Sequence, residues 1–145
     1  MNKNIPDIYN SLQEIALHFG SHGVNGECCG DLSLIEFMVL KKVNEKSNLS
    51  IQEVGAAINF TKSGATRMID RLENKGYVIR EHSSADGRIC CVTVTSKGKE
   101  TIANIIEKYT VYLNEVLKDL KPLMVDRIKD VLEILVESVQ QHEPI

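Results

Sequence analysis

The sequence predicts a mainly α-helical protein with one small β-hairpin, which places it in the α+β class. Apolar residues recur every three or four positions over most of the 145 residues, the spacing of amphipathic helices. One Asp-Gly pair, Asp86-Gly87, lies between two short runs rich in β-branched residues, which indicates a hairpin. No apolar run approaches the roughly 18 residues of a membrane span, so no membrane partner is expected.

The net charge of −3 is unevenly distributed along the chain. Residues 61–100 carry 8 Lys or Arg against 5 Asp or Glu, whereas residues 1–60 carry 4 against 7 and residues 101–145 carry 5 against 8. A basic centre is a weak electrostatic footprint for a polyanion, and chance variation explains it about equally well. The start, MNKNIPDIYN, has no apolar signal-peptide core, which predicts a cytoplasmic protein with reduced cysteines.

The first predicted helix covers residues 6–19 and begins behind Pro6, a residue suited to a first helical turn. Four glycines in the next twelve residues interrupt the helical pattern. It resumes over residues 32–46. The residues expected to face inward in these two helices are Ile8, Leu12, Ile15, Phe19, Leu34, Phe37, Met38 and Val43.

Two shorter helices are predicted next, each behind a hydroxyl side chain. Ser50 and Glu53 have the spacing of a capping box at the start of SIQEVGAAI. Thr61 caps the helix that follows, and Gly76 ends it. The expected inward residues are Ile51, Val54, Ala57, Ile58, Ala65, Met68, Ile69 and Leu72.

The period then changes from helical to alternating. Residues 77–82 and 89–95 read as two strands of a hairpin, in which Cys90, Val92 and Val94 share the face expected to be packed. From Ser96 the chain is again helical, with a restart at Pro122. The two terminal helices, about 25 and 20 residues, are long against a mean near 11–12, so we expect them to pack against a second copy of the chain.

Two short helices followed by a hairpin form a winged helix-turn-helix, in which the second helix enters the major groove of DNA. Short donors and long cations lie off the apolar stripe of that helix, and these groups suit phosphates and base edges. A solvated helix face explains any one of them, but explains the whole set poorly. They are Thr61, Lys62, Ser63, Thr66, Arg67 and Arg71.

The segment from Leu49 to Glu100 closely resembles the DNA-binding core of the MarR (multiple antibiotic resistance regulator) family. Its specific elements are the RLENKGYVIR junction and a wing signature of Asp-x-Arg, then Thr and Lys-Gly. The signature residues are Asp86, Arg88, Thr95, Lys97 and Gly98. The resemblance covers nearly the whole chain and implies one domain, 1–145, with a winged helix-turn-helix lobe at 32–95 and dimerisation helices at 6–19 and 96–141.

The resemblance also implies a function: a homodimeric, sequence-specific regulator of transcription, acting as a repressor on a pseudo-palindromic duplex. Arg88 would enter the minor groove from the wing tip, and Asp86 would orient an arginine. The residues assigned to DNA binding are Ser50, Thr61, Lys62, Ser63, Thr66, Arg67, Arg71, Asp86, Gly87, Arg88 and Lys97.

Repressors of this family release DNA in response to an effector. No cofactor is expected to be required, and the metal question is open. Cys28 and Cys29, near His18, His22 and Glu27, leave three interpretations open: unreactive thiols, an oxidant sensor, or a sensor of a soft metal or metalloid, since soft thiolates suit such ions. Adjacent strand residues point to opposite faces, so Cys90 and Cys91 cannot easily share one metal ion. These two cysteines are therefore interpreted as packing residues.

An enzyme is the main alternative from another class of protein. No nucleophile elbow, phosphate-binding loop or metalloprotease helix motif occurs, so catalysis is not expected. A winged-helix interaction module without DNA binding is a further alternative, which the Asp86-x-Arg88 signature and the cations Lys62, Arg67 and Arg71 disfavour.

Overall fold

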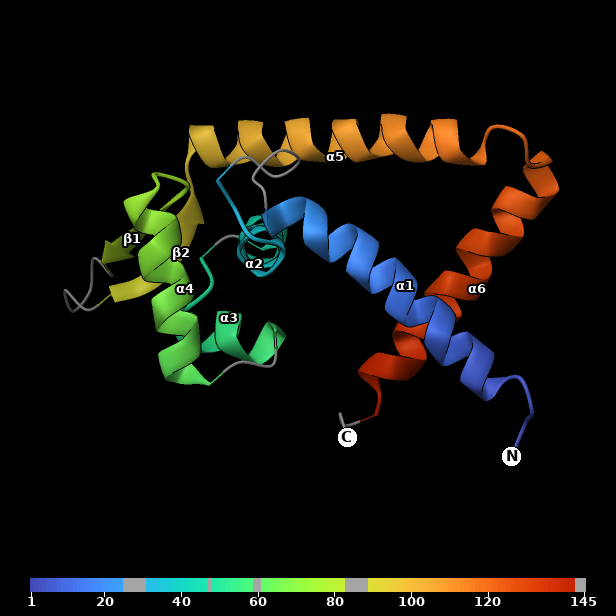
Figure 1. Ribbon diagram of the computed structural model, residues 1–145. Coiled ribbons are helices and arrows are strands. Elements are labelled where there is room, and N and C mark those ends of the chain that lie inside the picture. The colour runs from blue at the N-terminus through green and yellow to red at the C-terminus, as the bar shows by residue number, and fades with distance from the viewer. Residues whose placement is uncertain (25–30, 47, 59–60, 83–88, 143–145) are drawn as a thin grey trace. The chain divides into compact units, whose positions relative to one another are not determined.

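The computed structural model (Figure 1) describes residues 1–24, 31–46, 48–58, 61–82 and 89–142, and for residues 21–24, 62, 89 and 90 the backbone alone. The predicted helical fold with one hairpin is confirmed. Its elements are α1 (Ile5–Val24), α2 (Leu34–Glu45), α3 (Ile51–Ala57), α4 (Lys62–Asn74), β1 (Val78–His82), β2 (Ile89–Val94), α5 (Ser96–Leu117) and α6 (Pro122–Gln140). The chain divides into two compact units, Met1–Ile106 and Glu107–Ile145.

Side-chain caps fix the starts of the short helices. The Ser50 hydroxyl accepts from the Glu53 backbone N–H at 3.0 Å, and the Glu53 carboxylate accepts from the Ser50 N–H at 3.3 Å, so the predicted capping box is confirmed. The Thr61 hydroxyl accepts from the Gly64 N–H at 3.1 Å. Gly76 follows α4 with φ +85°, a conformation that favours glycine and ends the helix as predicted.

The first helix is longer than predicted. The sequence places its end at Phe19, before the glycine-rich stretch, but α1 continues to Val24. A glycine in a helix costs only about 1 kcal/mol relative to alanine, which is too little to end a long helix by itself. Gly20 therefore lies within α1.

The inward faces of α2 and α3 also differ from the prediction. Phe37 and Val43 are buried as expected, but Leu34 and Met38 are exposed. The buried positions of α2 are Glu36, Phe37, Val39, Leu40 and Val43. The buried stripe includes Glu36, which forms an ion pair with Lys75, a contact that apolar periodicity does not register. In α3, Val54 and Gly55 are buried, whereas Ala57 is exposed.

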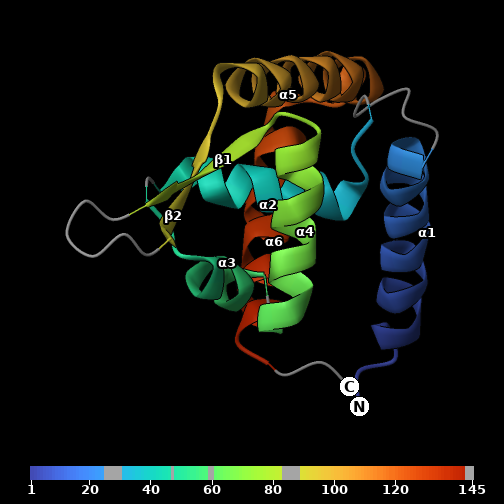
Figure 2. The ribbon, with the colours of Figure 1, turned by 90° about the vertical axis from the view of Figure 1, so that its left-hand side faces the viewer.

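The hairpin consists of β1 and β2 in antiparallel pairing, with Val78 opposite Val94 and Arg80 opposite Val92. The Val92 N–H donates to the Leu49 carbonyl at 2.8 Å, so the chain before α3 extends the pairing by one bridge. Figure 2 shows the hairpin beside α4, which contacts β1. On α4, Ala65, Ile69 and Leu72 are fully buried, as predicted.

The second unit contains the end of α5 and all of α6. No described residue of α6 is buried, although the helix carries many apolar side chains. All the buried apolar residues that the structure describes lie between Leu32 and Ile105. None of the helices, over their described residues, combines the length and apolarity that crossing a membrane requires.

Candidate DNA-binding surface

The outer face of α4 carries the polar residues that the sequence assigns to DNA binding. Thr61, Ser63, Arg67 and Arg71 are exposed. Thr66 is half-buried, and Lys62 lies in the first turn. Because Ala65, Ile69 and Leu72 hold the opposite face in the core, this polar face is turned outward.

Arg80 of β1 joins the hairpin to α4. Its guanidinium donates to the carboxylates of Asp70 and Glu73, with Nη1 at 2.7 Å from Glu73 Oε1, and its backbone N–H donates to Glu73 Oε2 at 3.2 Å. Burial lowers the pKa of Arg80, but the hydrogen bonds and charges of the two carboxylates outweigh it and raise the pKa above its ordinary value. The side chain is therefore a permanent cation that pairs with both acidic groups of α4 and offsets one of their two negative charges.

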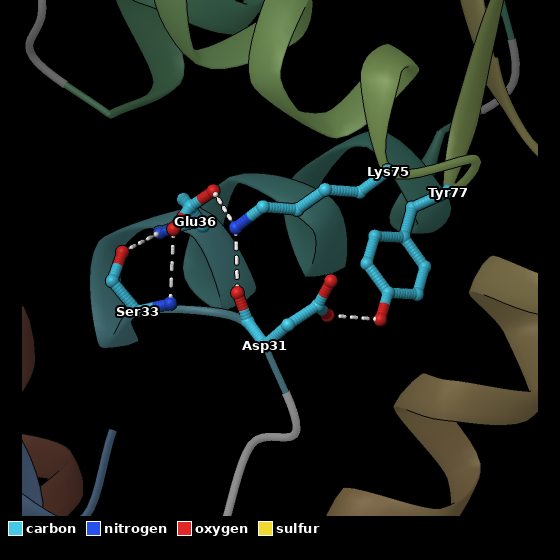
Figure 3. Close-up of polar contacts among 5 residues, drawn as sticks. All are labelled: Asp31, Ser33, Glu36, Lys75 and Tyr77. Atoms are coloured by element: carbon cyan, nitrogen blue, oxygen red, sulfur yellow. Dashed lines mark hydrogen bonds and ion pairs between the residues drawn. The ribbon is translucent and has the colours of Figure 1, made fainter. Parts of the chain in front are cut away.

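A second polar cluster, the Tyr77 cluster, lies just beyond the C-terminal end of α4 and consists of Asp31, Glu36, Lys75, Tyr77 and Lys97. Figure 3 shows four of these residues together with Ser33. The Lys75 ammonium donates to the Asp31 carbonyl at 2.5 Å and to Glu36 Oε2 at 2.9 Å. The Tyr77 hydroxyl donates to Asp31 Oδ1 at 2.5 Å, and Lys97 Nζ lies 4.7 Å from the centre of the Tyr77 ring.

The electrostatics of this cluster follow from its burial and its partners. Burial raises the pKa of Glu36, but hydrogen bonds from Lys75 and Ser33 outweigh it, so the pKa lies below its usual value. Burial, with the hydrogen bond to Asp31 and the charge of that carboxylate, raises the pKa of Tyr77 to about 12. Glu36 is thus held as an anion and Tyr77 as a neutral donor.

The base of the hairpin is fixed by signature residues. The Thr95 hydroxyl donates to the Gly76 carbonyl at 2.7 Å and accepts from the Gly98 N–H at 3.1 Å. Lys97 Nζ donates to the Lys75 carbonyl at 2.7 Å. A Cβ at Gly98 would collide with the Tyr77 carbonyl and lie 2.6 Å from Val94 Cγ1.

Several predicted residues lie outside the described residues: Glu27, Cys28, Cys29, Asp86, Gly87 and Arg88. His22 is helical, with its side chain undescribed, and His18 is exposed, with its ring 5.5 Å from that of Phe19. Within the described residues, no group of three or more His, Cys, Asp or Glu is placed to hold a metal ion.

The burial of Cys91 agrees with the packing interpretation, but the face assigned to this residue needs correction. Cys91, assigned to the face opposite Val92, is only 5 % exposed, because both faces of β2 are covered at this point. It is also disulfide-bonded, against the expectation of reduced cysteines. That expectation came from the cellular compartment alone, but pairing depends also on whether the fold brings two sulfurs within bonding reach. The other cysteine side chains, including Cys90, lie outside the described residues.

The Tyr77 cluster is the part of the site that the sequence reading missed. Ser33 and Glu36 have the same capping-box spacing as Ser50 and Glu53, and both of their reciprocal bonds form. That signal was available. The contact of Lys75 with Glu36 joins residues 39 positions apart, and no local pattern announces it.

The two helices α3 and α4 with the β1–β2 hairpin define a winged helix-turn-helix protein. Residues 32–90 match the MarR family. The chain is 30% identical over 115 residues to the HTH-type transcriptional regulator SarZ of Staphylococcus saprophyticus, covering 77% of this chain and 73% of SarZ. It is 28% identical over 110 residues to the uncharacterized HTH-type transcriptional regulator YfiV of Bacillus subtilis, covering 76% and 69%.

Solved structures agree on the fold. A MarR family protein from Bacillus stearothermophilus superposes with a TM-score of 0.82 at 21% identity, over 97% of this chain and 99% of that one. Streptococcus pneumoniae FabT in complex with DNA superposes with a TM-score of 0.76 at 18% identity, over 96% and 97%. This chain belongs to the MarR family of helix-turn-helix transcriptional regulators, which are transcription factors and not enzymes.

Proposed function

We propose that this protein is a homodimeric repressor that binds a pseudo-palindromic duplex and is released by an effector. The observation that carries the proposal is the outer face of α4. Arg67 and Arg71 are exposed there and form no ion pair among the described residues, while the acidic residues of the same helix, Asp70 and Glu73, pair with Arg80. A helix that offers exposed cations and hydroxyl groups is suited to the major groove.

The terminal helices support the dimer. Large apolar side chains of α1, α5 and α6 are more than a third exposed in the single chain, and exposed apolar surface that is contiguous is typical of an interaction site. Dimers of this class place two recognition helices about 34–36 Å apart, hence a pseudo-palindromic site. These exposed residues are Ile5, Ile8, Tyr9, Ile15, Leu17, Ile106, Val111, Tyr112, Leu113, Val116, Leu123, Met124, Val131, Leu132, Ile134, Val136 and Val139.

The test is binding of a labelled duplex selected from a random-sequence library by the full-length chain. Affinity should fall steeply with salt, because each phosphate contact releases counterions. Arg88→Ala should cost about 1–3 kcal/mol of binding free energy if the wing reads DNA, whereas the exposed Lys3→Ala should change affinity little. Absence of binding at low salt would refute the proposal.

A thiol-based effector response is the second candidate function. It is supported by the disulfide at Cys91, a buried residue of the strand that pairs with β1. Oxidation of two thiols by hydrogen peroxide yields a disulfide and two waters, and making or breaking the disulfide of Cys91 would alter the packing of β2. Cys28 and Cys29, with His18, His22 and Glu27, remain proposed sensor residues.

Release of the bound duplex should be measured with hydrogen peroxide, arsenite, zinc, copper(I) and salicylate. The wild type, a Cys28→Ser/Cys29→Ser variant and Cys91→Ser are compared. A thiol sensor loses its response to peroxide or to a thiophilic ion in one of these variants but keeps its affinity for DNA. If every agent acts equally on all three proteins, the cysteines are not the switch.

A further inference from the structure

The cations of the basic segment fall into two groups. Arg67 and Arg71 point outward from α4 without ion pairs among the described residues. Lys75 and Lys97, which follow α4 and begin α5, direct their ammonium groups to acceptors within the protein. Equal charge in the sequence therefore serves two different purposes in the fold.

Lys75 fixes the end of α4 to the start of α2. Two of its three N–H donors are taken by the Asp31 carbonyl and the Glu36 carboxylate. Glu36 is only 6 % exposed. Removing the cation that pairs with a buried carboxylate strongly destabilises the folded protein. Lys75 is the cation that balances it.

Lys97 attaches the first turn of α5 to the same point. Its Nζ donates to the Lys75 carbonyl at 2.7 Å, one of the carbonyl groups left over at the end of a helix. It also lies over the ring of Tyr77, whose hydroxyl bonds to Asp31. The end of α4 is thus held from α2 and from α5 at once.

We propose that Lys75 and Lys97 are positioning residues for DNA recognition and not phosphate contacts. They set the direction in which α4 presents its outer face, so their loss degrades recognition of sequence while leaving the count of phosphate contacts intact. This replaces the DNA contact assigned to Lys97 from the sequence, and it rests on the proposed function. A set of binding side chains loses affinity for its target when it is displaced by about 1 Å, so the position of the end of α4 matters for recognition.

The test compares full-length Lys75→Met and Lys97→Met with Arg67→Met and Arg71→Met. Affinity is measured over a range of salt for the selected duplex and for a scrambled duplex. We expect the two lysine variants to lose about tenfold in affinity for the selected duplex, less for the scrambled one, with an unchanged salt slope. The salt slope is the slope of the logarithm of the binding constant against the logarithm of the salt concentration. Each phosphate contact removed should lower its magnitude by about 0.9, hence by about 1.8 per dimer in the arginine variants.

A double-mutant cycle supplies a readout that a merely structural role would not move. In a Glu36→Gln background, Lys75→Met should cost less than in the wild type, because the two residues act as a unit. Lys75→Arg should restore most of the affinity. Circular dichroism establishes that each variant is folded. If Lys75→Met unfolds, Tyr77→Phe replaces it, because this substitution removes only a hydroxyl group. Tyr77→Phe should lose affinity for the selected duplex with an unchanged salt slope.

Two results overturn the inference: a slope lowered by about 1.8 in a lysine variant, or full affinity for the selected duplex in both. A wild type that selects no duplex refutes the proposed function itself, and the inference falls with it. These failures are distinguishable because the last one appears without any substitution.

Discussion

The two units of the chain differ in how they keep apolar side chains from water. In the first, Val39, Leu40, Val54, Ile69 and Val92 are completely buried within one chain. In the second, α6 buries none of its described residues. Helical periodicity is clear in both units, so an amphipathic pattern does not by itself tell whether an apolar face is buried within the same chain.

The largest effect is expected from a cavity in the first unit. Ile69→Ala should lower the free energy of unfolding by about 2–5 kcal/mol, because it removes fully buried methyl groups from a core that cannot collapse. Urea unfolding at fixed protein concentration measures it. The same substitution at the exposed Ile79 of β1 is the control and should cost much less. Equal losses would show that the unit has no specific core.

An intermediate effect is expected in the second unit. Val131 of α6 is 62 % exposed in the single chain, so Val131→Asp should not disturb the first unit. In the proposed dimer it would bury a carboxylate, and the dissociation constant should rise about tenfold or more. Sedimentation equilibrium measures it, with Gln140→Asp as the control for added charge on α6. A monomeric wild type would contradict the proposal that a second copy of the chain covers the apolar side chains of α6.

The smallest effect concerns Tyr77, which lies in the first unit between α4 and the hairpin. The folded-state pKa is about 12 against an ordinary value of 10.0, so the phenol stabilises the fold fully below pH 10. That contribution is lost as the pH rises from about 10 to about 12, because the unfolded chain releases the proton first. The stability gap between wild type and Tyr77→Phe should narrow over this window. Parallel pH curves would contradict the assignment.

Local features of the fold could be predicted because each depends on a few neighbouring residues. Ser50, Thr61 and Gly76 mark helix ends through bonds or backbone angles that reach three residues at most. The hairpin followed from a turn signal between alternating runs. The prediction of these elements did not depend on which distant residues pack against them.

Features that depend on distant partners could not be predicted. The inward face of α2 includes Glu36, which is tolerated there only because Lys75 arrives from the end of another helix. Arg80 reads as one more cation for a polyanion, yet it bonds to Asp70 and Glu73. Net charge per segment therefore overestimates the cations free to meet DNA.

The glycine at position 98 changes what the wing signature means. Any side chain there would collide with the Tyr77 carbonyl, and Thr95 beside it bonds to Gly76 across the same junction. Thr95 and Gly98 are therefore conditions for closing the hairpin against α5, whatever the molecule binds. A chain that has lost its ligand but kept its shape would retain them. Within the signature, Thr95 and Gly98 therefore carry no information about DNA binding, and the proposed contact of Arg88 is the part that the Arg88→Ala variant tests.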